Sequence, residues 1–184
     1  MTSVTSSQAI EDVVRQEGGK LVITKSGSLP VAEGIAREKA PFGGGENGHC
    51  YWPGHQSPTD GPMNPAMMLD LLARTRRPLS ELVAELPRYE VVKKKVPFPR
   101  SLRDRAMARV LETLSTEAER VVTLDGVKAF WPDGWLLVRP SGTEPICQFF
   151  SESKDLEVAR RINRKGIDLV QALTREADTS GPER

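Results

Sequence analysis

The sequence predicts two small domains, an α/β domain over residues 1–88 and an α+β domain over residues 89–184. In the first part, short apolar segments alternate with amphipathic helical segments, which is typical of a parallel α/β layer. In the second part, strand candidates lie between two helical segments, which is typical of an α+β domain. Pro87 and the alternating prolines Pro97 and Pro99 frame the boundary, because such prolines enforce an extended connection.

The first part opens with a helix signal. Ser6 and Ser7 can cap a helix, and the glycine pair after Glu17 can end it. The short apolar segment 21–24 predicts a strand covered on both faces, and residues 31–39 predict a second helix. The apolar face of the first helix consists of Ala9, Ile10, Val13 and Val14.

A third helix is predicted to start at Asn64, where a capping residue stands before a proline suited to the first turn. Its apolar face predicts inward-facing methionines, which we interpret as core residues rather than as a binding surface. Residues 78–86 predict one further short helix. The inward positions of the third helix are Met67, Met68, Leu71 and Leu72.

The second part carries two helical patterns, over residues 102–114 and 155–176. Together with four strand candidates they predict a four-stranded antiparallel sheet with both helices on one face. Three consecutive lysines occur in the first strand, and such lysines usually keep a sheet edge soluble and unpaired, an interpretation favoured over nucleic-acid binding. The strand candidates are residues 89–96, 127–130, 135–138 and 146–150.

The composition fits a soluble protein of the cytoplasm. The 26 basic and 25 acidic residues leave a net charge of +1, so no global field attracts nucleic acid or an anionic membrane, and any anion site must be local. No apolar stretch approaches the length of a membrane helix. Cys50 and Cys147 lack the spacing of a metal site, and we expect both to be reduced thiols.

The most informative segment is residues 137–145, with the sequence LVRPSGTEP, in which an apolar strand leads into a compact turn. Arg139 offers a planar guanidinium, which suits a phosphate group. Ser141 and Thr143 offer hydroxyls, and Gly142 lets backbone N–H groups approach an oxyanion. These residues predict a phosphate-binding turn. The same residues are equally compatible with an alternative, a tight polar hairpin loop that carries an ordinary surface arginine.

The turn and its flanks resemble the last domain of the α-D-phosphohexomutases, the family of phosphoglucomutase, phosphomannomutase and phosphoglucosamine mutase. The resemblance rests on RPSGTEP at residues 139–145, on GWLLV before it and on LDGVK at residues 124–128. Upstream, FGGGENGH at residues 42–49, followed by Asp60 and Gly61, resembles the sugar-recognition loop of the family's third domain. Family-like sequence extends from about Val4 to Leu173.

The resemblance implies a truncated three-layer α/β sugar-recognition domain followed by a phosphate-binding domain with a TATA-box-binding-protein-like α+β fold. It also implies that Arg139, Ser141, Gly142 and Thr143 bind a substrate phosphate. Members of the family are isomerases that interconvert hexose 1-phosphates and hexose 6-phosphates in carbohydrate metabolism.

The family's phosphoserine loop and its aspartate-rich Mg²⁺ loop have no counterpart in the 184 residues. We therefore expect no catalytic residue, no metal ligand and no cofactor on this chain. The resemblance implies Mg²⁺ only for the complete family enzyme.

The sugar loop departs from the family pattern. The position of the family's first glutamate, which hydrogen-bonds sugar hydroxyls, is Gly45 here, and glycine has no side-chain acceptor. Loss of such a hydrogen bond typically costs about 1–3 kcal/mol of binding free energy. The bond is retained if the Glu46 side chain turns towards the sugar or if the loop shifts by one residue. Glu46, Asn47 and His49 are the candidate sugar-binding residues; His49 is as well explained as an ordinary loop histidine.

Two further positions complete the comparison with the family. His55 lies in a turn and is interpreted as a surface residue. Gln148 stands where the family often has an arginine, which removes one positive charge from the neighbourhood of the turn.

Three hypotheses remain open. The leading one is the C-terminal part of a phosphohexomutase, which binds the distal phosphate of a hexose phosphate and contributes to an enzyme when another chain supplies the first two domains. The apolar flank left by those domains then predicts self-association or a partner. The alternative, favoured by Gly45, is a non-catalytic phosphosugar- or phosphate-binding module, and the third is a remnant without a ligand. Nothing distinguishes glucose, mannose and glucosamine phosphates.

Overall fold

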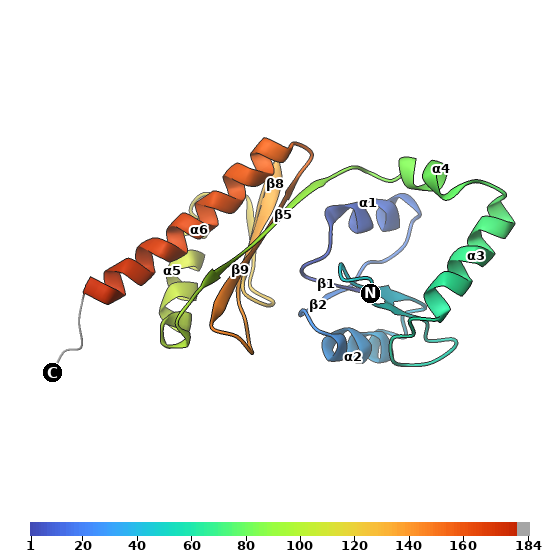
Figure 1. Cartoon of the computed structure of the whole chain (residues 1–184), viewed down its shortest axis with the longest axis horizontal. Helices are drawn as coiled ribbons and strands as arrows, with labels where there is room; N and C mark the ends of the chain where they lie inside the picture. Colours follow the sequence, from blue (N-terminus) through green and yellow to red (C-terminus); the bar gives the residue numbers. More distant parts are fainter. Residues whose placement is uncertain (180–184) are drawn as a thin grey trace. The chain divides into compact units, whose positions relative to one another are not determined.

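The computed structural model of the chain describes residues 1–179. It forms two compact units, Met1–Arg88 and Tyr89–Arg184, called here the N-terminal and the C-terminal unit. Each unit is described by itself (Figure 1). Between residues 1 and 179, no helix combines the length and the apolar composition needed to cross a lipid bilayer.

The N-terminal unit opens with the predicted parallel α/β arrangement. Strand β1 (Thr2–Ser3) pairs in parallel with β2 (Ile23–Thr24), and helix α1 (Gln8–Gln16) connects them. The Ser7 hydroxyl accepts a hydrogen bond from the Ala9 N–H at 3.1 Å, which confirms the expected cap. Strand β2 is shorter than the predicted segment 21–24.

Helix α2 (Ser28–Glu38) packs beside these strands, and β3 (Gly43–Gly44) and β4 (Cys50–Tyr51) form an antiparallel hairpin. Met1 joins the hairpin to β1, because its carbonyl accepts the Gly44 N–H at 3.1 Å. The core of this unit is small. Its buried members are Met1, Val31, Ile35 and Tyr51.

Helices α3 (Met63–Thr75) and α4 (Leu79–Ala84) complete the N-terminal unit, and no residue of either helix is buried. The prediction that the methionines of α3 belong to the core was therefore wrong: Met68 is 40% exposed. Helical spacing predicted an apolar face correctly, but it could not tell whether other elements cover that face. The exposed apolar side chains of α3, of α4 and of the segment that follows α4 are Met68, Leu69, Leu71, Leu79, Val83 and Leu86.

Asn64 does not cap α3, because the helix begins one residue earlier, at Met63. Its side chain instead joins α3 to the hairpin region. The Asn64 Oδ1 atom accepts the Trp52 indole N–H at 2.9 Å, and the amide group donates to the Gly48 carbonyl at 3.3 Å. A capping motif and a long-range hydrogen bond use the same side-chain atoms, and the long-range partner prevails here.

The C-terminal unit is an antiparallel sheet of five strands in the order β5-β9-β8-β7-β6, covered by α5 and α6 (Figure 1). The prediction of four strands is corrected by β6, a three-residue edge strand that pairs with β7. Such a short segment beginning with arginine carries no alternation from which a strand could be recognised. The strands are β5 (Glu90–Pro97), β6 (Arg120–Val122), β7 (Val127–Trp131), β8 (Gly134–Pro140) and β9 (Ile146–Ser153).

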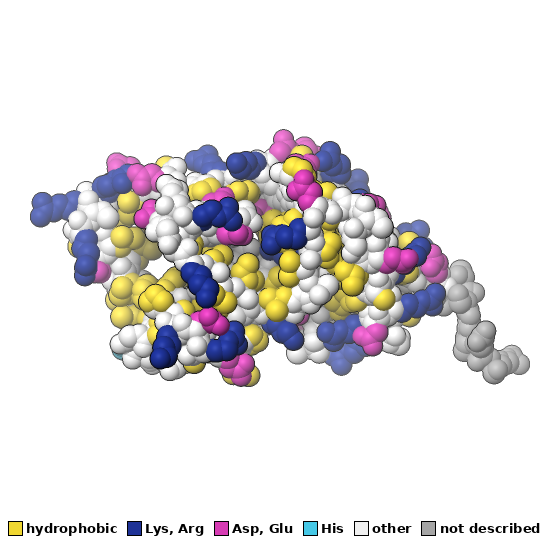
Figure 2. All heavy atoms as spheres, turned by 180° about the vertical axis from the view of Figure 1, so that it is seen from behind, with side chains coloured by type: hydrophobic (Ala, Val, Ile, Leu, Met, Phe, Trp, Pro, Cys, Tyr) yellow, Lys and Arg dark blue, Asp and Glu magenta, His cyan; other side chains and the backbone are white. Residues whose placement is uncertain are grey.

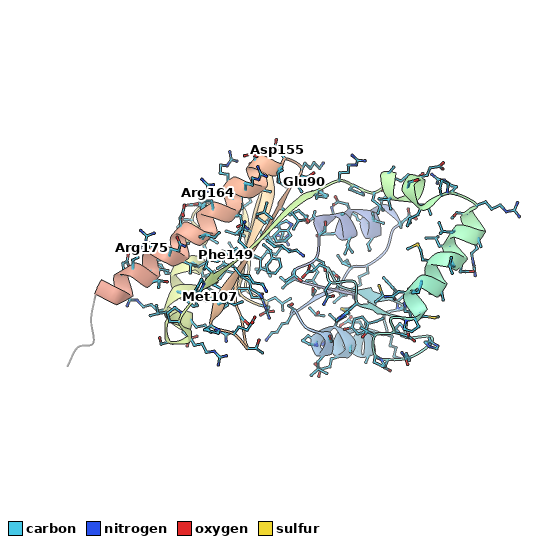
Figure 3. All side chains as sticks on the ribbon, in the orientation of Figure 1. Glu90, Met107, Phe149, Asp155, Arg164 and Arg175 are labelled. Atoms are coloured by element: carbon cyan, nitrogen blue, oxygen red, sulfur yellow. The ribbon has the colours of Figure 1, made fainter. Side chains whose placement is uncertain are left out.

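A single hydrophobic core lies between this sheet and its helices, α5 (Arg103–Ser115) and α6 (Leu156–Thr179). Phe149 of β9 is fully buried in it, and Met107 of α5 packs against it (Figure 3). Gly166 brings α6 close to the sheet, because a Cβ atom there would lie 2.9 Å from a methyl group of Leu136. The core holds the strand ends that carry the 139–145 turn.

Candidate functional site

The 139–145 turn connects β8 to β9 and is closed by backbone hydrogen bonds. The Ser141 N–H donates to the Ile146 carbonyl at 2.9 Å, and the Ile146 N–H donates to the Glu144 carbonyl at 2.9 Å. The Ser141 hydroxyl accepts the N–H groups of Thr143 and Glu144 at 3.3 and 3.1 Å. Ser141 therefore shapes the turn from inside.

The tip of this turn is open. Ser141 is buried, whereas Gly142 and Thr143 are exposed. A Cβ atom built on Gly142 would meet no atom within 4 Å. The Thr143 hydroxyl lies 3.4 Å from the Ser141 hydroxyl, so two hydroxyl groups and an unobstructed backbone lie together.

Arg139 precedes the turn and is held in a defined orientation. Its Nε atom donates to Asp125 Oδ2 at 2.8 Å, and one terminal amino group donates to the Gln148 side-chain oxygen at 3.0 Å. Gln148 thus orients Arg139. Two of the donor positions of the guanidinium are used for orientation, and the second terminal amino group is available to a ligand.

Asp125 reaches Arg139 because Gly126 allows a close approach of two backbone segments. Gly126 has a φ of +86°, and a Cβ atom there would lie 2.3 Å from the Val138 carbonyl oxygen. Any other residue would push the Asp125 turn away from β8. The sequence analysis did not identify Asp125 as a site residue, although an Asp-Gly pair is a recognisable turn signal.

Arg100 is a second functional candidate that the sequence analysis missed. Its guanidinium donates a hydrogen bond to the Thr143 carbonyl, across 43 positions of sequence. No local signal reveals such a contact.

The sugar-loop candidates lie on the hairpin of β3 and β4. The Gly45 N–H donates to the His49 carbonyl at 3.0 Å, and Gly48 has a φ of +80°, so the loop turns tightly. The Asn47 amide group lies 3.3 Å from the His49 ring nitrogen Nδ1, and Asn47 Oδ1 accepts the His49 N–H at 3.3 Å. The fold therefore brings Asn47 and His49 together.

A polar cavity of about 110 Å³ opens beside this hairpin. Glu46, Asn47 and His49 lie on one side of it, and the start of α2 lies on another. Gly27, which precedes α2, provides no side-chain cap for the helix. The sequence analysis missed the contribution of α2 to the cavity. The other lining residues are Ser3, Thr5, Ser26, Ser28, Val31, Gly45 and Tyr51.

Gly45 forms part of the cavity wall without supplying a hydrogen-bonding side chain. A Cβ atom at this position would lie 3.0 Å from the Asn47 side-chain oxygen. The adjacent Glu46 is exposed and belongs to the cavity lining. A carboxylate is therefore present at this site, one residue later than in the family pattern.

The described side chains, those of residues 1–176, do not fit a Mg²⁺ site, because no three His, Cys, Asp or Glu side chains among them lie close enough to hold a metal ion. His55 is paired with Asp60, at 3.1 Å between Nε2 and Oδ2.

Comparisons with known proteins give consistent results for both units. Residues 1–89 match the family model for the α/β/α domain III of phosphoglucomutase/phosphomannomutase, and residues 75–168 match the model for the C-terminal domain of the same enzymes. A probable phosphoglucosamine mutase from Methanopyrus kandleri is 42% identical over 175 residues, which are 95% of this chain and 38% of that protein. A phosphoglucosamine/phosphogalactosamine mutase from Sulfurisphaera tokodaii is 39% identical over 88% of this chain and 36% of its own length.

Solved structures show the same fold. A phosphoglucomutase/phosphomannomutase family protein from Burkholderia thailandensis aligns with a TM-score of 0.77 at 24% identity, over 94% of this chain and 37% of that one. Aspergillus fumigatus N-acetylphosphoglucosamine mutase, solved with GlcNAc-6P and magnesium, aligns with a TM-score of 0.71 at 13% identity, over 94% of this chain and 38% of that one. The chain thus spans about two fifths of the length of the proteins it matches.

Proposed function

Because the chain belongs to the phosphoglucomutase/phosphomannomutase family, with units that match the family's third and last domains, we propose that it binds a hexose phosphate. The 139–145 turn is the proposed phosphate-binding element of the C-terminal unit, and the cavity beside the hairpin is the proposed sugar-binding element of the N-terminal unit. The observation that carries this proposal is the turn itself, in which Asp125 and Gln148 orient Arg139 beside two hydroxyl groups and an open glycine.

The chemistry of the turn suits an oxyanion. A guanidinium with a free amino edge donates charge-assisted hydrogen bonds, which are about twice as strong as neutral ones. Because Arg139 is already held by two partners, little side-chain entropy is lost when phosphate binds. The Thr143 hydroxyl adds a donor at the exposed tip.

The sugar side depends on Glu46, Asn47 and His49. Glu46 accepts hydrogen bonds from sugar hydroxyls in place of the side chain that Gly45 lacks, while Asn47 and His49 donate. Without neighbouring domains, binding is about millimolar, because each element by itself supplies few contacts.

Catalysis requires the part of the family's length that this sequence does not contain. In the proposed role, the turn orients the phosphate that is not being transferred and offsets its charge. These two effects accelerate a reaction only when a nucleophile lies beside the substrate. A polypeptide carrying the family's first two domains would supply that nucleophile and Mg²⁺.

The contact surface for that polypeptide is the exposed apolar side of α3 and α4. Hydrophobic side chains gather on the surface at this end of the molecule (Figure 2, left). Leu69 is 66% exposed and Val83 is 52% exposed, so one side of each helix lacks a covering layer. Exposed apolar surface of this kind marks an interaction site.

This contact is tested by mixing the chain with the N-terminal portion of the Methanopyrus kandleri relative and measuring complex formation by sedimentation velocity. We expect a complex that Leu69→Asp weakens strongly, whereas Glu33→Asp on α2 leaves it unchanged. Self-association of the chain alone, abolished by Leu69→Asp, would instead assign the surface to a second copy.

The ligand proposal is tested by an amide NMR titration of the chain with glucosamine 6-phosphate, glucose 1-phosphate and inorganic phosphate. We expect sugar phosphates to shift signals of residues 44–49 and 139–143, and inorganic phosphate to shift the second group most. Glu46→Gln should weaken sugar-phosphate binding severalfold and leave phosphate binding unchanged. The absence of chemical-shift changes at both loops, up to high ligand concentration, would refute hexose-phosphate binding.

A second candidate function is a non-catalytic phosphate-binding module. Gly45 favours it, because the cavity has one hydrogen-bonding side chain fewer than the family pattern. Shifts confined to residues 139–143 with every ligand would support this alternative over the first proposal.

A further inference from the structure

Arg100 lies in the 3₁₀ turn Arg100–Leu102, which leads from the edge strand β5 into α5. Its backbone is held beside the 139–145 turn by Phe98, two residues earlier. The Phe98 side chain is buried in the core, and its N–H donates to the Pro145 carbonyl at 2.8 Å. The location of Arg100 is therefore fixed by backbone contacts as well as by its own side chain.

The side chain of Arg100 contacts the turn directly. One terminal amino group donates to the carbonyl of Thr143, the residue after Gly142. A guanidinium carries five N–H donors in a planar fork, so this bond leaves most of them available. Arg100 is exposed, and those donors face solvent beside the open tip of the turn.

The charges around the turn distinguish Arg100 from Arg139. Arg139 forms an ion pair with Asp125 at 2.8 Å, which offsets much of its positive charge. Among the described side chains, those of residues 1–176, no carboxylate forms an ion pair with Arg100 within 4.0 Å. Glu144 is the other charged residue of the turn; its backbone N–H donates to Ser141, and its side chain is exposed. Arg100 therefore differs from Arg139 in that no ion pair occupies its guanidinium.

We propose that Arg100 is a second phosphate-binding residue of the 139–145 turn. It donates to a phosphate oxygen in addition to Arg139, so that two guanidinium groups bind the dianion. This inference rests on the proposed function, because it assigns an additional residue to the same site. Arg139 is oriented within the sheet by an ion pair, whereas Arg100 contributes a guanidinium without an ion-pair partner from the 3₁₀ turn.

The test is a titration of the full chain with inorganic phosphate, followed by amide NMR at several salt concentrations, for the natural sequence and three variants. Arg100→Gln removes the charge and keeps polar bulk. Arg105→Gln is the matched control, because Arg105 is exposed on α5 and its loss changes the net charge equally. Arg139→Ala tests the turn itself.

We expect Arg100→Gln to weaken phosphate binding about tenfold and to flatten its dependence on salt, because a direct charge contact is screened by ions. Arg105→Gln should change neither quantity appreciably. Arg100→Lys should retain part of the affinity, since it keeps the charge but loses the planar fork.

The outcomes separate the inference from the function on which it rests. If Arg139→Ala abolishes binding and Arg100→Gln leaves it unchanged, the role of Arg100 is overturned and the phosphate site stands. If Arg100→Gln weakens binding but preserves the salt dependence, Arg100 is a positioning residue that acts through Thr143, and direct contact is overturned. If the natural sequence does not bind phosphate, both proposals fail.

Discussion

The 139–145 turn lies between two long strands of a five-stranded sheet, whereas the 43–51 hairpin is built on strands of two residues each. The turn is supported by one continuous core that includes both helices of its unit. The hairpin is supported by four buried side chains and by polar contacts such as that between Asn64 and Gly48. We infer that the phosphate site is preorganised by its own unit, and that the sugar site depends more on surrounding contacts.

This difference predicts that truncation of a core residue affects the two units unequally. Phe149→Ala should lower the free energy of unfolding by about 3–5 kcal/mol, because it leaves a cavity in a closely packed core. Leu69→Ala on α3 should change it by no more than about 0.5 kcal/mol, because Leu69 is exposed. Urea denaturation followed by circular dichroism measures both.

Equal losses for the two variants would mean that α3 is covered in solution, for example by self-association. Repeating the denaturation at a tenfold lower protein concentration distinguishes this case, because only an associated state depends on concentration.

Two glycines with positive φ sharpen the comparison between the loops. Gly126→Ala should destabilise the chain by at least about 2 kcal/mol, since a Cβ atom would collide with the Val138 carbonyl oxygen in addition to the strained backbone. Gly48→Ala should cost only about 1 kcal/mol, because a Cβ atom there meets nothing within 4 Å. Thermal unfolding of both variants checks the order. A larger loss for Gly48→Ala would contradict it.

Ligand affinity provides a third comparison. Arg139→Ala should weaken phosphate binding at low salt by about tenfold or more, because it removes charge-assisted hydrogen bonds. His55→Ala should have little effect, because His55 is paired with Asp60 in the other unit. Isothermal titration or NMR at low ionic strength measures the ratio. Equal losses, or none, would exclude the assigned turn.

The smallest predicted effect concerns the two thiols. Burial raises the pKa of Cys147 to about 12, and it also raises the pKa of the partly exposed Cys50. In the native state at pH 8, we expect a thiol reagent to label Cys50 slowly and Cys147 hardly at all, while both react after denaturation. Rapid labelling of Cys147 would show that the C-terminal sheet opens.

The same pKa shift fixes the direction of a pH effect. The unfolded thiol has a pKa of about 8.5, so the contribution of buried, neutral Cys147 to stability is complete below that pH. It declines as the pH rises towards 12, because the unfolded thiol ionises first.

Local sequence patterns predicted much of the C-terminal unit. Both helices and four of its strands are present close to the predicted residues, because each pattern is long enough to show its period. The fifth strand, β6, has three residues and was not predicted. In the N-terminal unit, the strands have two residues each. Such short strands show no alternation of apolar and polar residues, so the sequence pattern predicted their bounds poorly.

The sequence by itself determined the family, the α/β and α+β character of the two units and the composition of the 139–145 turn, because these are properties of contiguous residues. Only the tertiary structure decided that Asp125 and Gln148 orient Arg139, that Arg100 contacts the turn across 43 positions, and that the start of α2 lines the cavity beside the hairpin. It also decided that the apolar face of α3 is exposed. These outcomes depend on which distant segments come into contact. The packing of the whole unit sets those contacts, and the spacing of apolar residues within one segment does not encode them.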